Sequence, residues 1–266
     1  MINKRGQVTI FIIIAIVIVA AVIIFFAATD AGRKLVNKVI PGLAPSISPE
    51  EQLKNCFSDN KDIDTKLNKI LSQGGVSNPQ NYDVYNNTKI EYLCYTSEYL
   101  RTCYIQRPIL INNLESEIKK SIKPEIESCI KGVEQSLNEQ GYDVSTSGKI
   151  GDFTINLVPG KIKINTSYSI TAKGKENTYT LKNLEFERNS RAYELIMICA
   201  SMLNYESVYG NTESMAYMVL YPNVRVEKIQ REDGGRIYML TERDTGERFA
   251  FAVRSLVWPA GYSTIK

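Results

Sequence analysis

The chain has 266 residues with 32 basic and 29 acidic side chains, so its formal net charge is only +3. This near-neutral balance gives no electrostatic field for gathering DNA or RNA, and it excludes nucleic acid as a partner. The sequence has no histidine, which excludes Ser-His and Cys-His catalytic dyads and removes the commonest transition-metal ligand, so we expect neither a cofactor nor a metal site.

The first predicted element is an apolar helix long enough to cross a membrane. Between Val8 and Ala28 the only polar residue is Thr9, and no residue is charged. At about 1.5 Å per residue the run reaches roughly 30 Å, the thickness of the hydrocarbon core of a bilayer. We therefore predict a transmembrane helix in contact with membrane lipid. Basic residues flank the run on both sides, so the positive-inside rule does not fix its orientation.

The order of segments at the N-terminus carries a family resemblance. Residues 1–6 form a short basic leader that ends in the letters KRG, and Gln7 then opens the apolar helix. This organisation resembles a class III signal peptide, as in archaeal type IV pilin-like surface proteins. The resemblance implies that a prepilin peptidase cuts between Gly6 and Gln7, and that a helix over residues 7–40 anchors the mature protein or polymerises. The family commonly has glutamate where this chain has Phe11, a departure that favours a monomeric anchored protein.

A linker and two helices are predicted next. Residues 41–49 contain three prolines and should form a stiff, extended linker. The letters SPEE at residues 48–51 are typical of a helix start, and the glycines of the QGG segment at residues 73–75 should end the second helix. With its cysteine-bearing helix and QGG segment, the head resembles uncharacterised surface proteins of small-genome archaea. The apolar residues at helical spacing are Leu53, Cys56, Phe57, Ile63, Leu67, Ile70 and Leu71.

Residues 89–94 and 101–107 have the pattern of two short strands. Tyr92, Tyr95 and Tyr99 lie on this predicted hairpin. Because exposed tyrosine is a contact group of low conformational entropy, we expect these three side chains to form a contact edge. The alternative is that they pack half-buried, as tyrosine on strands mostly does.

The remaining sequence alternates helical and strand patterns. Apolar residues recur at helical spacing over residues 114–137, which predicts one long helix or a pair broken at Pro124. From Gly148 onward the apolar period changes to two, which predicts an antiparallel meander. A helix over residues 190–204 then precedes a second set of strands over residues 224–253.

These elements predict an α+β fold. We expect a long N-terminal transmembrane helix followed by an exported head of antiparallel sheets half covered by helices. The head should contain two α+β subdomains, residues 50–187 and 188–266, divided near Arg188.

The five cysteines lie far apart, and no C-x-x-C pair suggests a zinc site. Cys94 and Cys103 flank a short segment between two predicted strands, which suits a cross-strand disulfide. Cys56 and Cys129 each lie on an apolar helical stripe and are the other two candidates. The odd count leaves Cys199 as a thiol. The alternative is that all five are reduced and buried.

Two acceptor tripeptides for N-glycosylation begin at Asn86 and Asn165. Together with the oxidisable cysteines, they favour a location of the C-terminal part outside the cell.

Three sequence motifs are candidates for a catalytic site. The DTG letters at residues 244–246 match the triplet of aspartic proteases, but their charged neighbours indicate an exposed hairpin turn. Serine and lysine are close at residues 121 and 123 and at residues 147 and 149, yet neither pair has the S-x-x-K frame. The sequence also lacks the glycine-rich loop that binds phosphate. We therefore expect that the protein is not an enzyme.

The sequence as a whole predicts a membrane-anchored extracellular structural or adhesive protein. It would be pilin-like, with an N-terminal helix that anchors or polymerises and a head that contacts a protein partner or copies of itself. We expect a single pass through the cell membrane with the head outside. The alternatives are a monomeric tethered surface receptor or adhesin, and an ecto-hydrolase.

Overall fold

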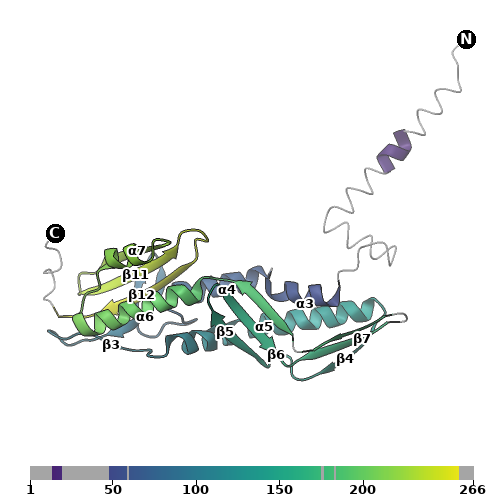
Figure 1. The fold of residues 1–266 in the computed structure, drawn as a ribbon, viewed down its shortest axis with the longest axis horizontal. Coiled ribbons are helices and arrows are strands. Elements are labelled where there is room, and N and C mark those ends of the chain that lie inside the picture. Colours follow the sequence, from purple (N-terminus) through teal and green to yellow (C-terminus); the bar gives the residue numbers. More distant parts are fainter. Residues whose placement is uncertain (1–13, 20–47, 59, 175–176, 183, 258–266) are drawn as a thin grey trace, which may run out of the picture. The chain divides into compact units, whose positions relative to one another are not determined.

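The computed structural model describes residues 14–19, 48–58, 60–174, 177–182 and 184–257. The chain divides into two units, Met1–Pro49 and Glu50–Lys266. In the first unit, residues 14–19 are helical. The second unit, called the head below, contains three sheets and the helices that pack on them (Figure 1).

The prediction of a long N-terminal transmembrane helix is wrong for the part of the chain that the structure describes. No helix there has both the length and the apolar composition needed to cross a bilayer. Residues 14–19 belong to the predicted helix 7–40. The leader, the bond between Gly6 and Gln7, and Phe11 lie outside the described residues, as does most of the predicted linker.

Helices α3 (Pro49–Ser58) and α4 (Lys61–Ser72) open the head at the positions that apolar spacing predicted. Helix α4 begins after Asn60, whose side-chain oxygen accepts hydrogen bonds from the backbone N–H groups two and three residues later. This N-cap satisfies donors that the first helical turn leaves unpaired. Gly74 and Gly75 follow the helix with φ angles of 85° and 81°, a region that glycine adopts without steric cost.

Helix α5 (Leu110–Glu139) is one continuous helix of 30 residues, which decides between the two alternatives that the sequence left open. It contains Pro124, which has no N–H to donate within the helix. Close to this proline, the Lys66 ammonium of α4 donates to the carbonyl oxygen of Ser121 at 2.9 Å and forms an ion pair with Glu125. The buried stripe of α5 consists of Leu110, Leu114, Ile118, Ile122, Ile126, Ile130, Val133 and Leu137.

The largest sheet has the strand order β1-β2-β12-β11-β10, with β3 also paired to β2. Strands β2 and β12 are parallel, whereas the other pairs of this sheet are antiparallel. The prediction of purely antiparallel sheets is therefore wrong at this pair, because the long connection through α5 and α6 returns the chain in the same direction. The strands are β1 (Tyr82–Tyr85), β2 (Thr88–Tyr95), β3 (Tyr104–Ile105), β10 (Val224–Gln230), β11 (Gly235–Glu242) and β12 (Arg248–Arg254).

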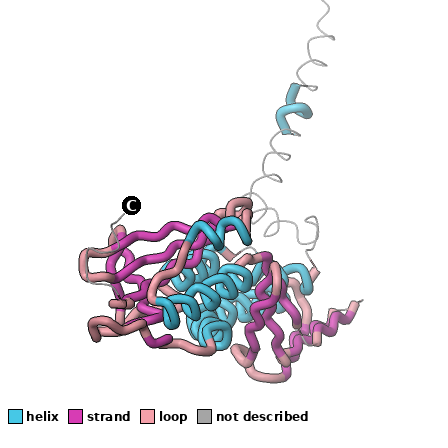
Figure 2. Tube along the Cα trace, turned by 60° about the vertical axis from the view of Figure 1, so that its left-hand side comes forward, coloured by secondary structure: helices cyan, strands magenta, loops and turns pink. Residues whose placement is uncertain are grey.

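Two smaller antiparallel sheets have the orders β4-β7-β8 and β5-β6-β9. Buried and exposed residues alternate along β5, β6 and β7, as the apolar period of two predicted. Strands β4 and β5 contact α5, and Figure 2 shows the helices between these strands and the largest sheet. The strands are β4 (Asp143–Ser147), β5 (Phe153–Val158), β6 (Lys161–Thr166), β7 (Ser169–Lys173), β8 (Thr178–Leu181) and β9 (Glu185–Asn189).

Helix α6 (Ala192–Tyr209) packs against β11 and β12 and also contacts α5. It is longer than the predicted helix 190–204 because it ends at Gly210, whose φ of 78° closes the helix in the left-handed conformation. The short helix α7 (Ser214–Leu220) was not predicted, and it contacts β10.

The α+β character of the head is confirmed. One apolar cluster joins helices α3 to α6 with one face of each sheet. A smaller cluster covers the second face of the largest sheet, because successive strand residues point to opposite faces. Its members are Ile90, Tyr92, Ile237, Ala250 and Ala252.

Candidate functional site

Two disulfides link segments of the head. Cys94 at the end of β2 is bonded to Cys103 before β3, with the Cα atoms 5.3 Å apart. Cys56 of α3 is bonded to Cys129 of α5, with the Cα atoms 5.7 Å apart. Both separations are ordinary for disulfides. Cys199 is a free thiol on α6, where burial raises its pKa well above the usual value.

This arrangement predicts a simple pattern of alkylation. Without reductant the native protein should gain no adduct, because Cys199 is fully buried. Unfolding without reductant should expose one thiol, and unfolding with reductant should expose all five cysteines. Intact mass spectrometry measures each adduct count. More than one adduct on the unfolded, unreduced protein would contradict the two disulfides.

The segment between Cys94 and Cys103, called the tip loop (residues 96–102), presents two large apolar side chains to solvent. Tyr99 is 72% exposed and Leu100 is 74% exposed. Leu100 has a φ of 58°, a left-handed conformation that costs a residue with a Cβ atom roughly 1–2 kcal/mol. Exposed, strained residues of this kind persist only where their surroundings hold them.

Backbone hydrogen bonds hold the tip loop against the end of β12. The N–H of Leu100 donates to the carbonyl oxygen of Leu256 at 2.8 Å, and the N–H of Leu256 donates to Arg101 at 3.0 Å. At the start of the loop, the N–H of Thr96 donates to Arg254 at 2.9 Å, and the Arg254 guanidinium donates back to the Thr96 carbonyl oxygen at 2.9 Å. These hydrogen bonds fix the tip loop to the end of β12.

Of the three tyrosines predicted to form a contact edge, the structure places only Tyr99 fully at the surface. Tyr92 is 7% exposed and packs edge-on against Tyr95, with the ring centroids 5.2 Å apart. Burial and the nearby carboxylates of Asp83 and Asp233 raise the pKa of the Tyr92 hydroxyl. Tyr92 points into the small cluster on the second face of the sheet, whereas Tyr99 lies beyond the end of β2 in the tip loop.

An apolar cleft of about 380 Å³ lies at the start of α6, lined also by residues 220–224 and by Glu242 at the end of β11. Tyr193, Met197 and Ile198 contribute its apolar lining from α6. Residues 220–223, at the end of α7 and after it, also line the cleft and are exposed, and Leu220 is 71% exposed. We call this site the apolar cleft.

Glu194 brings a carboxylate to the apolar cleft. Its Oε1 accepts hydrogen bonds from the N–H of Gly160 at 2.9 Å and from Nη1 of Arg191 at 3.2 Å. Its Oε2 is buried and has no hydrogen-bond partner among the described residues. Arg191 and Glu194 both line the cleft, so the cleft carries an ion pair whose side chains are 48% and 33% exposed.

The DTG residues lie close to this cleft but form a hairpin turn, as the sequence predicted. The carboxylate of Glu242 accepts hydrogen bonds from the N–H groups of Asp244 and Thr245 and from the Thr245 hydroxyl. Burial alone would raise the pKa of Glu242, but these hydrogen bonds outweigh it and lower the pKa. Gly246 closes the turn with a φ of 72°.

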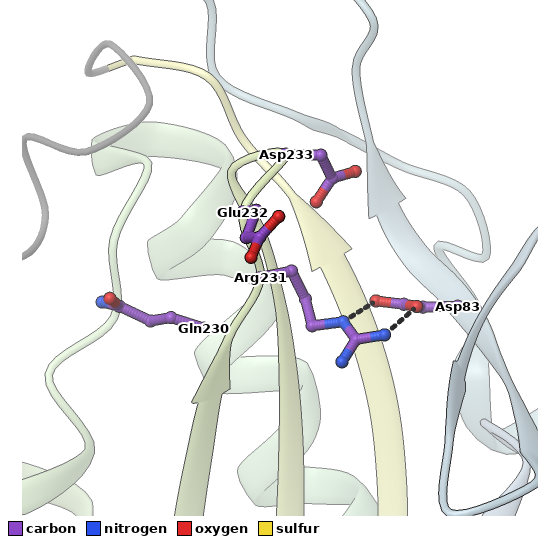
Figure 3. Close-up of a pocket in the computed structure, with 5 residues that line it drawn as sticks. All are labelled: Asp83, Gln230, Arg231, Glu232 and Asp233. Atoms are coloured by element: carbon purple, nitrogen blue, oxygen red, sulfur yellow. Dashed lines mark hydrogen bonds and ion pairs between the residues drawn. The ribbon is translucent and has the colours of Figure 1, made fainter.

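A second, polar cleft of about 470 Å³ lies beside the β10–β11 turn (Figure 3). Arg231 forms a bidentate pair with Asp83, at 3.0 and 3.1 Å, and Gln230 extends away from this pair. Asp233 accepts hydrogen bonds from the N–H of Gly235 and from Arg254. Both aspartates are thus engaged in holding the turn, and among the described residues no group of acidic, cysteine or histidine side chains could hold a metal ion.

A buried ionic network was missed by the sequence analysis. Glu206 of α6 is fully buried and pairs with Arg236 of β11 at 2.9 Å, while the Tyr238 hydroxyl and the N–H of Thr212 also donate to it. Burial and the Glu206 charge raise the pKa of Tyr238. Arg236 donates as well to the carbonyl oxygen of Gly210 at 2.7 Å. The network fastens the end of α6 to the sheet, and it opens to neither cleft.

The remaining predicted positions are dispersed. Asn86 lies in the exposed β1–β2 turn with a φ of 47°, and Asn165 is exposed on β6. The Ser147 hydroxyl is hydrogen-bonded to the Ser169 hydroxyl at 2.6 Å, and the backbone carbonyl oxygen of Ser121 accepts a hydrogen bond from Lys66.

The chain was also compared with known proteins. None of the family models, curated proteins or solved structures matches it. Its function is therefore argued from the tip loop, the clefts and the disulfides.

Proposed function

We propose that this chain is a structural or adhesive protein of the cell surface, with a head that acts outside the cell by contact rather than by catalysis. The N-terminal resemblance to pilin-like proteins is part of this proposal, with leader cleavage between Gly6 and Gln7. The observation that carries the proposal is the tip loop, in which a disulfide and four hydrogen bonds hold two apolar side chains in solvent.

The disulfides support the location. Structural disulfides persist in oxidising compartments and are rare in the cytosol. One of them joins residues 73 positions apart and the other closes the tip loop, so oxidation affects both the core and the contact surface. The exposed Asn86 and Asn165 are compatible with glycan attachment outside the cell.

The rigidity of the tip loop supports a binding role. A preorganised aromatic and aliphatic pair loses little conformational entropy when it is buried by a partner. The strain at Leu100 has no evident structural benefit, because asparagine or glycine would adopt the same backbone more easily. A monomeric receptor or adhesin would use the same loop, so it remains the second form of this proposal.

Contact is favoured over hydrolysis by the state of the carboxylates in the polar cleft. A general acid or base needs a carboxyl group that is free to exchange a proton with substrate. Asp83 is instead held by Nε and Nη2 of Arg231, and Asp233 is held by Arg254 and by the backbone N–H of Gly235.

The proposal is tested by the variant Leu100→Asn in the full-length protein. We expect binding to envelopes of the source cell to fall at least about tenfold, as for loss of an apolar anchor. The free energy of unfolding should rise or stay level, because asparagine tolerates the left-handed conformation. Sedimentation with envelopes and urea denaturation measure the two quantities.

The matched control is Tyr82→Ser on β1, which removes a partly exposed aromatic ring outside the tip loop. It should leave envelope binding unchanged. Wild-type binding by Leu100→Asn and by Tyr99→Ser would contradict a contact role for the tip loop.

A further inference from the structure

The tip loop and the apolar cleft lie at opposite ends of the largest sheet. In the antiparallel register of β11 and β12, Arg254 pairs with Gly235, whereas Arg248 pairs with Thr241 at the other end. The tip loop is bonded to residues 254–256, and the cleft includes Glu242. At about 3.4 Å per residue, the length of β11 separates the two sites by roughly 24 Å. The tip loop therefore cannot fill the cleft of its own chain.

The two sites are complementary in polarity. The tip presents Tyr99 and Leu100, and the cleft is floored by apolar side chains of α6 and walled by Leu220. Its volume of about 380 Å³ lies at the small end of the roughly 300–1,000 Å³ typical of binding pockets, which suits one or two side chains.

The charges are complementary as well. Arg101 follows Leu100 and forms an exposed pair with Glu98 at 3.4 Å, with both side chains more than half exposed. Such a pair contributes little and can exchange partners. The cleft contains the pair of Arg191 and Glu194 at 3.2 Å, whose side chains are 48% and 33% exposed. The two pairs can exchange partners, so that the tip guanidinium meets Glu194 and the tip carboxylate meets Arg191.

We propose that the tip loop of one copy inserts into the apolar cleft of a second copy. Tyr99 and Leu100 bury their side chains there, Arg101 pairs with Glu194, and Glu98 pairs with Arg191. Because the two surfaces are different and lie at opposite ends of the largest sheet, the contact is heterologous and each added copy exposes a new tip and a new cleft. This inference rests on the contact role proposed above and names the partner as the same chain.

The contact area is small, since three side chains of the tip carry it. Interfaces of this size lie below those of stable complexes, so the experiment uses full-length protein at high concentration. Two variants that each add one cysteine, Leu100→Cys in the tip and Met197→Cys in the cleft, are mixed and oxidised. We expect a disulfide-linked dimer of the two variants. Met197 is a suitable position because it lines the cleft and is partly exposed.

The matched control replaces Met197→Cys with Val208→Cys, which lies exposed on α6 outside the cleft. That mixture should give much less product. Sedimentation velocity provides an independent measurement: Leu100→Asn in the tip and Leu220→Ser in the cleft should each weaken self-association at least about tenfold. Arg101→Glu should weaken it too, because it brings a carboxylate to Glu194.

The outcomes separate this inference from the contact role. Equal cross-linking to positions 197 and 208, with no self-association of the wild type, overturns insertion into the cleft. If Leu100→Asn still reduces envelope binding in that case, the tip contacts a different macromolecule and the proposed function stands. If Leu100→Asn changes neither envelope binding nor self-association, both proposals fail.

Discussion

The substitution Glu206→Leu is expected to lower the free energy of unfolding by about 3–5 kcal/mol, because it leaves a guanidinium buried without its counter-charge. Glu206 is fully buried, and the side chain of Arg236 is only 6% exposed. The same substitution leaves the Tyr238 hydroxyl and the N–H of Thr212 without their acceptor. Urea denaturation followed by circular dichroism measures the loss.

Two further variants separate the buried charge from lost packing. The double variant Glu206→Leu, Arg236→Met removes both charges, and it should recover part of the loss because apolar side chains can replace a buried pair. The control Glu185→Gln removes an exposed partner of Lys163 and should cost less than about 1 kcal/mol. A cost of that small size for Glu206→Leu would show that the network does not fasten α6.

Removal of the Cys56–Cys129 disulfide by paired serine substitutions should cost about 4 kcal/mol. The bridge closes a loop of 73 residues in the unfolded chain, and the entropy that it removes from the unfolded state grows with loop length. Thermal or urea denaturation of the variant under non-reducing conditions measures the change.

The second disulfide provides the comparison. Cys94 and Cys103 are nine positions apart, so the corresponding paired serine variant should cost about 2.5 kcal/mol on the same account. It should also loosen the tip loop and weaken its binding. A larger loss of stability from the short loop than from the long one would contradict this ordering.

Local patterns predicted the elements of the head well. Helix α5 was predicted because residues such as Ile118, Ile122 and Ile126 recur at the spacing of one helix face, and these residues are buried. The end of α6 was placed too early because the apolar spacing weakens after Leu203, whereas the helix continues to its glycine cap.

Features that depend on distant segments could not be predicted in this way. The parallel pairing of β2 with β12 joins strands far apart in the sequence, and nothing local specifies it. The apolar cleft combines the start of α6, the segment before β10 and the end of β11. Glu206 did leave a local signal, because it continues the stripe of Cys199 and Leu203 on α6, and a charge at such a position requires a buried partner.

The transmembrane prediction had a different basis. It rested on the composition of residues 8–28 alone. From the composition one can calculate how much hydrocarbon a continuous helix would span, but the composition does not establish that the residues form such a helix. Tyr92 does not reach the surface, because the second face of the largest sheet carries the small cluster around Ile90 and Tyr92.

The parallel pairing also sets the order in which the head can form. Strand β2 lies between β1 and β12, so an emerging chain leaves that side of β2 open until residues Arg248–Arg254 arrive. Contacts between such distant segments slow folding and prolong the exposure of aggregation-prone edges. A chaperone that shields β2 until β12 is available would therefore increase the yield of correctly assembled heads.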